Sequence, residues 1–395
     1  MTPTPLHEPT IDLDVALRPT HLEVDLDALA DNVAAIAAKV GPAVGMMPVL
    51  KANAYGHGLV PVARLCQRLG VPYLGLAYLE EAIRLRQAGV TTPILVMGGI
   101  LGSQLPLFIQ HDLTITASSV DKLQAVEACA RAMGRPARVH LKIDTGMERI
   151  GVHWYSAQAL LQASLQLRHV RVEGIFSHLA NADATDLSHA RLQLERFMEV
   201  LDFYPRHGLP TPLRHLANSG GVLQLPEAWL DLVRPGLLTY GVLPAPGLPP
   251  TISVRPALTW VSRIVYFKVV RAGSPVSYGS TWAPATQTRL VTVPVGYGDG
   301  YMRAMSGRAQ VLIRGQRYPV VGRICMDQVM VDIGQDSAWN GDPVLLLGRD
   351  GDQQITVEEL AEWAGTIPWE VLTSINTRVP RIYRSARFPE LATTP

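Results

Sequence analysis

Short apolar runs alternate with amphipathic segments along the first 240 residues of the chain. Residues 58–70 and 79–89 carry apolar side chains at i, i+3, i+4 and i+7 and end in glycine, which predicts helices. The runs between such segments are apolar on both faces, as in parallel strands that helices cover on both sides. They are HLEVDL, MMPVLKA, YLGLA, PILVMGG, LTITA, RVHLKID, VEGIFSHLA, LRHLANS and LDLVRPG. About eight strand–helix units predict a (β/α)8 barrel, with a doubly wound parallel sheet as the alternative.

The pattern changes near residue 250. From there on, runs of alternating apolar and polar residues are separated by turn residues, which is typical of a mainly β domain. The runs are LTWVSRIVYFKVV, RLVTVPVGYG, AQVLIRGQRYPVVG and DPVLLLG. We therefore expect a flexible extension at residues 1–16, a barrel at residues 17–250 and a mainly β domain at residues 251–395.

Composition and charge exclude several classes of partner. The chain has 395 residues, 48% of them hydrophobic, and a formal net charge of +1. This charge gives no overall reason to bind nucleic acid or an anionic membrane, and we expect neither as a partner. The N-terminus has no signal-peptide pattern and no run approaches the roughly 18 apolar residues of a membrane span, so we expect a cytoplasmic protein. Cys66, Cys129 and Cys325 are too few and too scattered for a disulfide framework or a zinc site, and we expect no metal.

The first candidate for chemistry is Lys51, which ends an apolar run in the stretch VLKANAYGHG. Catalytic residues of a (β/α)8 barrel lie where strands end, although a lysine there can also simply extend its charge into water. Asn53, Tyr55 and His57 follow directly. A desolvated lysine beside polar groups is what imine formation with a carbonyl cofactor requires.

This stretch resembles the pyridoxal-phosphate lysine motif of the alanine racemase family. Further segments match the same family in order, from about residue 18 to residue 384: HLKIDTGMERIG, GIFSHLANAD, HLANS, LVRPG, VSYGSTW, PVGYGDGY, VGRICMDQ and TRVPRIY. The resemblance implies pyridoxal 5′-phosphate bound to Lys51 as an internal aldimine. It also implies a barrel followed by a β domain, in agreement with the pattern of apolar residues.

The resemblance places Arg234 on the pyridine nitrogen of the cofactor. Because arginine keeps its protons, that nitrogen should stay unprotonated and the ring should be a weaker electron sink than with a carboxylate partner. The phosphate should be held by the backbone of Gly236 and Leu237 and by the hydroxyls of Ser219 and Tyr55. The full set of cofactor-binding residues implied is Lys51, Tyr55, Arg149, His178, Asn218, Ser219, Arg234, Gly236, Leu237 and Tyr297.

Racemisation with two bases needs a proton acceptor on each face of a planar carbanion. The resemblance assigns Lys51 to one face and Tyr278 to the other. A tyrosine, with a reference pKa of about 10, needs neighbouring donors or cations to act as a base. His178 is implied to bond to this tyrosine and to connect it to Arg234, with His215 supporting the same network.

HLKIDTGMERIG contributes two cations, Lys142 and Arg149. In the family the arginine approaches the phenolic oxygen of the cofactor and the carboxylate of the substrate, and the lysine can carry a carbamate. A carbamate would replace the positive charge of Lys142 by a negative one and turn repulsion from Arg149 into a charge-assisted bond. The carboxylate of Glu148 could supply some of the same compensation.

The resemblance also assigns residues of the β domain to the substrate. The backbone N–H of Met326 should hold the substrate carboxylate, and the implied substrate site includes Cys325 and Asp327. Tyr297, Arg303 and Arg323 are expected at the entrance. Where the family often has a further phosphate-binding tyrosine, this chain has Thr377, whose shorter side chain argues against a direct bond and for a wider entrance.

The resemblance therefore implies interconversion of L-alanine and D-alanine by two bases on a pyridoxal-phosphate aldimine, in a head-to-tail homodimer with shared active sites. D-alanine biosynthesis for peptidoglycan is the role that this activity suggests. The alternatives are a racemase of broader amino-acid specificity and a non-catalytic pyridoxal-phosphate carrier, which would need no second base such as Tyr278. A decarboxylase on a related barrel would have an acidic partner for the pyridine nitrogen, and Arg234 argues against it.

Overall fold

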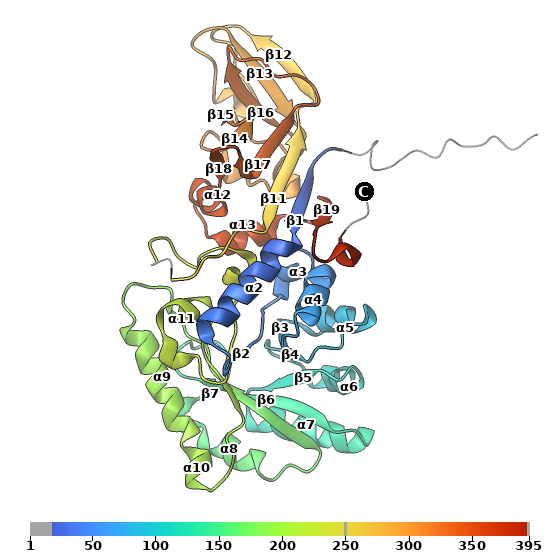
Figure 1. Ribbon diagram of the computed structural model, residues 1–395, viewed down its shortest axis with the longest axis vertical. Coiled ribbons are helices and arrows are strands. Elements are labelled where there is room, and N and C mark those ends of the chain that lie inside the picture. The colour runs from blue at the N-terminus through green and yellow to red at the C-terminus, as the bar shows by residue number, and fades with distance from the viewer. Residues whose placement is uncertain (1–17, 249–250, 393–395) are drawn as a thin grey trace, which may run out of the picture. The chain divides into compact units, whose positions relative to one another are not determined.

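The structure, a computed structural model, describes residues 18–248 and 251–392 (Figure 1). They fall into two compact units, which we describe separately. Unit 1 comprises residues 18–23, Thr259–Ile367 and Ser374–Pro380, and unit 2 comprises residues 24–248, 251–258, Pro368–Thr373 and 381–392. The expected flexible extension, residues 1–16, lies outside the described residues. Unlike the expected linear division, residues 251–258 and 381–392 belong to unit 2.

Unit 2 is a closed barrel of eight parallel strands, counted over the described residues. Six of them pair in the order β3-β4-β5-β6-β8-β9, and β10 pairs with β2. Backbone hydrogen bonds close the ring, from the Arg234 N–H to the Ala217 carbonyl (2.9 Å) and from the Gly75 N–H to the Pro48 carbonyl (3.0 Å). The eight strands are β2 (Gly45–Met46), β3 (Leu74–Leu76), β4 (Ile94–Val96), β5 (Thr114–Ala117), β6 (Ala137–Asp144), β8 (Val170–Phe176), β9 (Leu213–His215) and β10 (Leu232–Val233), with β7 (Val152–His153) beside β6. The predicted (β/α)8 barrel is confirmed.

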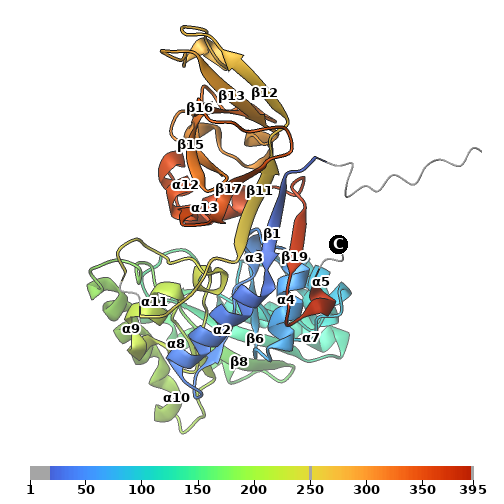
Figure 2. The same cartoon turned by 45° about the horizontal axis from the view of Figure 1, so that its top comes forward.

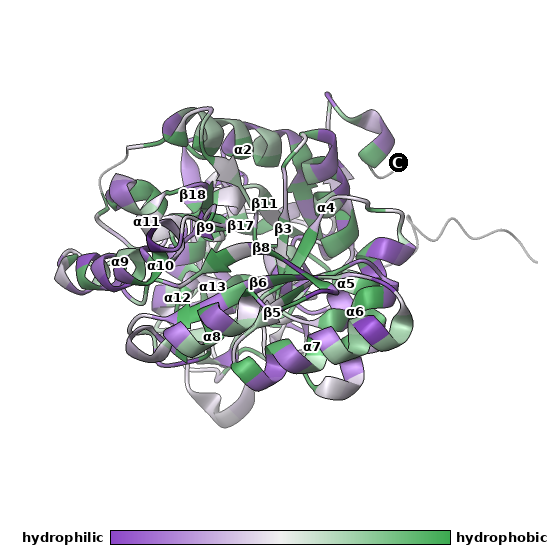
Figure 3. Ribbon diagram, turned by 90° about the horizontal axis from the view of Figure 1, so that it is seen from below, coloured by the Kyte–Doolittle hydropathy of each residue, from purple (hydrophilic) through white to green (hydrophobic). Residues whose placement is uncertain are grey.

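Helices surround these strands, and their apolar faces explain why (Figure 3). In α4, for example, Leu59, Val62 and Leu65 are buried on one side, and each fully buried leucine contributes about 1.5–3 kcal/mol. Ser119 caps the start of α7 and a left-handed Gly134 ends it. The helices are α2 (Leu26–Val40), α3 (Lys51–Tyr55), α4 (Leu59–Arg68), α5 (Leu79–Gln87), α6 (Leu105–Gln110), α7 (Val120–Met133), α8 (Gln158–Ser164), α9 (Ser188–Leu201), α10 (Phe203–Arg206) and α11 (Ser219–Gln224). The helices predicted over 58–70 and 79–89 are α4 and α5.

Unit 1 is mainly β, as predicted. Its strands pair antiparallel in the order β12-β13-β16-β15-β14-β17-β11, and β18 pairs with β17. Arg314 and Gly315 both have positive φ, which suits the two-residue hairpin between β14 and β15. The strands are β11 (Leu258–Arg263), β12 (Tyr266–Val270), β13 (Thr288–Val293), β14 (Gln310–Ile313), β15 (Gln316–Val321), β16 (Val329–Gly334), β17 (Pro343–Asp350) and β18 (Gln353–Ile355).

The remaining elements complete the two units. In unit 1, α12 (Val357–Ala364) begins with a capping box, in which Thr356 and Glu359 bond to each other's backbone N–H. α13 (Pro368–Ser374) follows, and all but its last residue belong to unit 2. β1 (His21–Asp25) carries the chain from unit 1 into unit 2, and β19 (Arg381–Arg384) belongs to unit 2. In the part of the chain that the structure describes, no helix combines the length and apolar character needed to cross a membrane.

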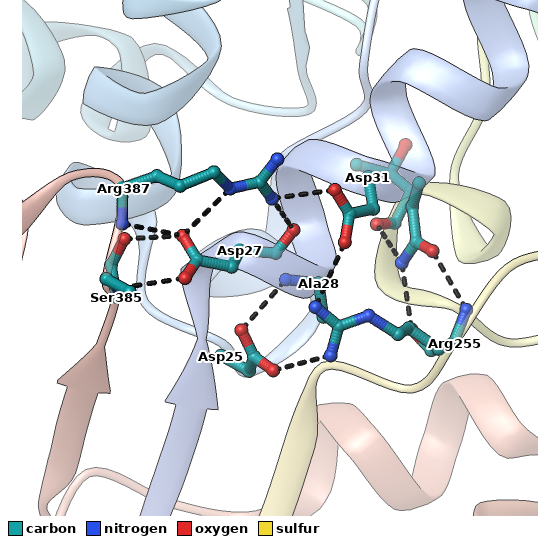
Figure 4. Close-up of polar contacts among 10 residues, drawn as sticks. Asp25, Asp27, Ala28, Asp31, Arg255, Ser385 and Arg387 are labelled. Atoms are coloured by element: carbon teal, nitrogen blue, oxygen red, sulfur yellow. Dashed lines mark hydrogen bonds and ion pairs between the residues drawn. The ribbon is translucent and has the colours of Figure 1, made fainter.

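Polar contacts attach the C-terminal segment to α2 (Figure 4). Ser385 donates to Asp27 (2.6 Å), and Arg387 forms an ion pair with Asp31 (2.7 Å). Arg255 pairs with the same Asp31 (3.0 Å). These contacts explain why residues after β19 belong to the barrel unit, as Figure 2 also shows from a second direction.

Candidate functional site

Lys51 stands at the end of the first barrel strand and begins an unusual turn. The four residues after it, Ala52, Asn53, Ala54 and Tyr55, have φ values of 53°, 57°, 54° and 50°. A left-handed turn costs roughly 1–2 kcal/mol for each such residue, so neighbouring bonds must hold it. The Ala54 N–H donates to the Leu50 carbonyl (2.8 Å), and the Asn53 side chain accepts from the N–H that starts α4 (2.9 Å). Strain of this kind is typical of functional sites, and here it directly follows Lys51.

The surroundings of Lys51 disfavour its charged form relative to a lysine in water. Burial lowers the pKa of Lys51, the positive charge of Arg149 lowers it further, and the carboxylate of Glu81 opposes the shift. A lysine acts as a nucleophile or base only when it is deprotonated. A lowered pKa is a property that such chemistry requires of Lys51, whose role stays a prediction.

Lys142 is a second buried cation in the same barrel. Burial, then the charge of Arg234, lowers its pKa to about 7, although Asp144 opposes the shift. Its amine donates to the Ile143 carbonyl (3.1 Å) and lies 5.0 Å from the Phe176 ring. Lys142 and Arg234 are both buried, and the charge of one acts on the other, which favours an anionic ligand between them; Arg149 is exposed.

Asp144 holds the loop that carries Arg149. One carboxylate oxygen accepts from the N–H groups of Gly146 (2.8 Å), Met147 (2.9 Å) and Glu148 (3.2 Å), and the other accepts from the Arg149 N–H (3.1 Å). Although burial opposes the shift, these bonds keep the pKa of Asp144 below its usual value. Sequence reasoning missed Asp144, whose signal was an Asp-x-Gly turn directly after a strand.

Glu148 has a different partner from the one expected. Its side chain is 68% exposed, and its carboxylate lies 2.8 Å from Nε2 of His153. The amine of Lys142 instead meets a backbone carbonyl. The structure therefore gives no support to charge compensation of Lys142 by Glu148.

Arg234 follows β10 and is 2% exposed. Its Nη2 donates to the carbonyls of Ser177 (2.7 Å) and Leu216 (2.9 Å) and lies 3.3 Å from Nδ1 of His178, while its Nη1 lies 2.9 Å from Nδ1 of His215. All four contacts use the two terminal nitrogens, so the Nε–H remains as a donor for a ligand. Burial and the charge of Arg149 lower the pKa of Arg234, yet a guanidinium stays protonated.

His178 is neutral and has one donor to offer. Burial, followed by the charge of Arg234, lowers its pKa well below the usual value. Nη2 of Arg234 has two N–H groups for three acceptors, so its 3.3 Å contact with Nδ1 of His178 shares a proton with a carbonyl; since Arg234 only donates, Nδ1 is the acceptor in that contact and the proton of His178 is assigned to Nε2. The predicted contact between His178 and Arg234 is present, and the Nε2–H is available to a second group.

Ser219, Gly236 and Tyr55 form a cradle of hydrogen-bonding groups. The Ser219 hydroxyl accepts from the Gly236 N–H (2.9 Å), and Leu237 begins the 3₁₀ turn that follows. A Cβ on Gly236 would lie 2.7 Å from the Tyr55 hydroxyl, so glycine is needed there. Backbone N–H groups and hydroxyls in this arrangement fit a phosphate. The Asn218 side chain instead caps α11 by accepting from the Gly221 N–H (3.1 Å), so its visible role is structural.

In unit 1, Tyr278 lies in a short 3₁₀ turn and is 70% exposed. The hydroxyl of Ser277, which has a φ of 67°, donates to the Arg323 carbonyl (2.6 Å). A Cβ on Gly279 would lie 3.1 Å from Cζ of Arg323. The predicted residues Tyr278 and Arg323 are therefore neighbours, and the turn presents the phenol at the surface of the unit.

The other predicted residues of unit 1 lie on two loops that bond to each other. The Tyr297 N–H donates to the Cys325 carbonyl (3.0 Å), and the Gly298 N–H donates to the Met326 carbonyl (2.8 Å). Tyr297 and Met326 remain 42% and 52% exposed. Arg303 begins the next 3₁₀ turn.

A buried carboxylate that the sequence did not reveal lies beneath these loops. The Asp299 side chain is fully buried, accepts two bonds from Arg18 (2.9 and 2.8 Å) and one from Arg378 (2.6 Å). Arg378 also pairs with Asp327 (2.6 Å) and is next in sequence to the exposed Thr377. Asp299 thus ties the loop of Tyr297 to the loop of Met326.

Known proteins give an independent view of the chain. Two family models match it, "Alanine racemase, N-terminal domain" over residues 24–244 and "Alanine racemase, C-terminal domain" over residues 257–383. An alanine racemase of Symbiobacterium thermophilum is 44% identical over 374 residues, which is 94% of this chain and 99% of the relative.

Solved structures agree with these matches. An alanine racemase of Clostridium difficile 630 superposes with a TM-score of 0.89 at 35% identity, covering 94% of this chain and 97% of the other. An alanine racemase of Bacillus anthracis with bound L-Ala-P superposes with a TM-score of 0.88 at 34% identity, covering 94% of this chain and 96% of the other.

Proposed function

Because the chain belongs to the alanine racemase family, we propose that it interconverts L-alanine and D-alanine with pyridoxal 5′-phosphate held at Lys51. The observation that carries this proposal is one barrel end that combines a lysine of lowered pKa with a buried arginine bonded to neutral groups. The lysine suits an aldehyde, and the arginine suits a ring nitrogen that is to stay unprotonated.

The residues of the barrel fit this cofactor. When bound, pyridoxal phosphate supplies an aldehyde that links to amines and a ring that stabilises the carbanion left by removal of the α-proton. Ser219, Tyr55 and the N–H groups of Gly236 and Leu237 would hold the phosphate, and Arg149 would face the phenolic oxygen. Arg234 would donate to the ring nitrogen. The Arg149 loop is held for this task by the four bonds of Asp144.

Lys51 and Tyr278 are the proposed bases. The Lys51 amine would take the α-proton on one face and the Tyr278 phenol would return one on the other, or the reverse. The Nε2–H of His178 would donate to the Tyr278 oxygen and so stabilise its phenolate form. The Met326 N–H, together with Arg149, would hold the substrate carboxylate.

The exposure of Tyr278 leads to the proposal of a head-to-tail homodimer. A catalytic phenol needs neighbours that lower its pKa, and a side chain that is 70% exposed has few. Tyr78 and Leu101, on loops that follow β3 and β4, are 60% and 69% exposed. Large exposed apolar side chains at this end of a barrel suit a surface that a second copy covers. Tyr278 of one subunit would then complete the site of the other.

Carbamylation of Lys142 is part of the proposal. A pKa of about 7 leaves much of this amine unprotonated near neutral pH, which is the form that adds carbon dioxide. The resulting negative charge would pair with Arg149. An intact-mass measurement in bicarbonate, with Lys142→Ala as control, should show the addition only in the chain that has Lys142.

The test of the function is chiral analysis of the purified protein with a panel of L-amino acids, with and without added cofactor. We expect D-alanine from L-alanine and no release of amine or carbon dioxide. Borohydride should fix the cofactor to Lys51, and Lys51→Ala should bind it only reversibly. Conversion of many amino acids would indicate a broader racemase, whereas bound cofactor without any turnover would indicate a carrier.

A further inference from the structure

Two histidines form a buried chain behind Arg234. Nδ1 of His215 lies 2.9 Å from Nη1 of Arg234, and its Nε2 lies 2.9 Å from Nδ1 of His140. Both imidazoles are fully buried, and burial together with the charge of Arg234 lowers their pKa values, to about 3 for His140. Both are therefore neutral. His140 has no part in the proposed reaction, so its presence in the barrel needs another explanation.

The direction of each hydrogen bond follows from Arg234. A guanidinium only donates, so Nδ1 of His215 accepts and carries no proton. The one proton of His215 is then on Nε2 and is donated to Nδ1 of His140. His140 must in turn carry its own proton on Nε2. A single assignment of protons satisfies both bonds.

The barrel is locally irregular where it holds His140. The pairing of β6 with β8 shifts register between Val139 and His140, and Gly174 stands opposite His140. A Cβ on Gly174 would lie 2.6 Å from Nδ1 of His140, so only glycine leaves room for the ring. Among the described residues, Nε2 of His140 has no hydrogen-bond partner although it is buried. An unpaired buried donor destabilises a fold, and such exceptions concentrate at functional sites.

We propose that His140 is a positioning residue for Arg234, because it accepts the Nε2–H of His215 and thereby holds His215 in the tautomer that accepts from Arg234. This inference rests on the proposed function, in which Arg234 faces the ring nitrogen of the cofactor. Without an acceptor at position 140, His215 is free to carry its proton on Nδ1, where it would oppose an N–H of Arg234. The guanidinium of Arg234 then loses one of its four contacts. Its Nε–H, which would donate to the ring nitrogen, is held less firmly in the direction of that nitrogen.

A pair of variants separates hydrogen bonding from packing. His140→Asn keeps an oxygen near the position of Nδ1, whereas His140→Leu fills the space without an acceptor. With pyridoxal phosphate labelled with nitrogen-15 in its ring, we expect the ring-nitrogen signal of His140→Leu to move toward that of an unbonded pyridine, and that of His140→Asn to stay near wild type. kcat for alanine should fall about tenfold in His140→Leu and by no more than about twofold in His140→Asn, with KM unchanged in both.

A second measurement uses the wild-type protein and reads the histidine tautomers directly, without any activity assay. Nitrogen-15 spectra of its histidines, with the His140→Asn spectrum to assign the signals, should show His140 and His215 as neutral rings protonated on Nε2. A proton on Nδ1 of His215 would overturn the proposal, as would equal ring-nitrogen signals in the Asn and Leu variants. Absence of racemisation and of cofactor binding in wild type would instead overturn the proposed function, and the histidine spectra would still decide the tautomers.

Discussion

The barrel and the β unit hold their shares of the proposed site in different ways. In the barrel, Arg234 and Lys142 are 2% and 3% exposed, and the Arg234 side chain is bonded to groups on or directly after neighbouring strands. In the β unit, Tyr278 and Met326 are 70% and 52% exposed; Met326 is bonded through its carbonyl, and Tyr278 lies in a turn that the neighbouring Ser277 holds. Burial sets pKa values and directions in advance, whereas an exposed group depends on what later covers it. The barrel share is thus preorganised, whereas the role proposed for the β share requires a second surface to cover it.

Replacing Tyr278 tests the contrast between the buried barrel residues and the exposed residues of the β unit. Of the predictions made here, it should change the rate of racemisation most. Tyr278→Phe removes a base but no buried contact, so racemisation should fall about 10²–10⁴-fold while the melting temperature and cofactor binding stay as in wild type. Tyr266→Phe, which also changes an exposed tyrosine of unit 1, is the matched control and should be fully active. Wild-type turnover by Tyr278→Phe would remove this residue from the mechanism.

Asp299→Asn tests whether the loops of Tyr297 and Met326 in the β unit depend on the buried carboxylate of Asp299. The change leaves Arg18 and Arg378 beside a neutral amide, and breaking a buried ion pair costs about 3–5 kcal/mol. We expect urea unfolding of unit 1 at lower concentration and a raised KM for alanine, since the loops of Tyr297 and Met326 lose their common support. Asp352→Asn, at an exposed turn, serves as control. If Asp299→Asn and Asp352→Asn unfolded at the same urea concentration, the ion pairs of Asp299 would contribute nothing to the stability of unit 1.

Acid should affect the barrel more than the β unit. His140, His178 and His215 have pKa values below the unfolded value of about 6.5, because burial and the charge of Arg234 disfavour their charged forms. Below that pH the unfolded chain binds more protons than the folded one, so the free energy of unfolding falls by about 1.4 kcal/mol per pH unit for each histidine.

Among the described residues of unit 1 the only histidine is His21, which is partly exposed. Urea unfolding followed by limited proteolysis, between about pH 7 and about pH 4.5, should therefore show the barrel opening first. Equal acid sensitivity of both units would contradict the buried neutral histidines.

Glu148→Gln should have the smallest effect. Its carboxylate bonds to the exposed His153 rather than to Lys142, and exposed ion pairs contribute about 0–1 kcal/mol. We expect kcat and KM within about twofold of wild type. Lys142→Met provides the contrast, because it removes a buried cation. A large loss of activity in Glu148→Gln would indicate that the carboxylate of Glu148 does compensate the charge of Lys142, as the sequence suggested.

The sequence predicts the elements of this protein better than its site. Periodicity located α4 and α5 to within about two residues, because one buried face determines both pattern and helix. The backbone preferences of Ala52, Asn53, Ala54 and Tyr55 do not predict four left-handed residues after Lys51. Hydrogen bonds formed only in the folded chain stabilise that turn. The sequence also offered no reason to predict roles for His140 and Asp299, because their bonding partners are far away in the chain. Their partners His215 and Arg18 are 75 and 281 residues away in the chain.

The central claim is that one chain supplies Lys51 and a second chain supplies Tyr278. The most direct measurement mixes Lys51→Ala chains with Tyr278→Ala chains under conditions of subunit exchange, confirmed by native mass spectrometry. Each mixed dimer should contain one site with both bases and one with neither. With random pairing, about half of the dimers are mixed, so activity should return to about a quarter of wild type, far above either variant alone. Complete exchange without recovery of activity would contradict the shared site.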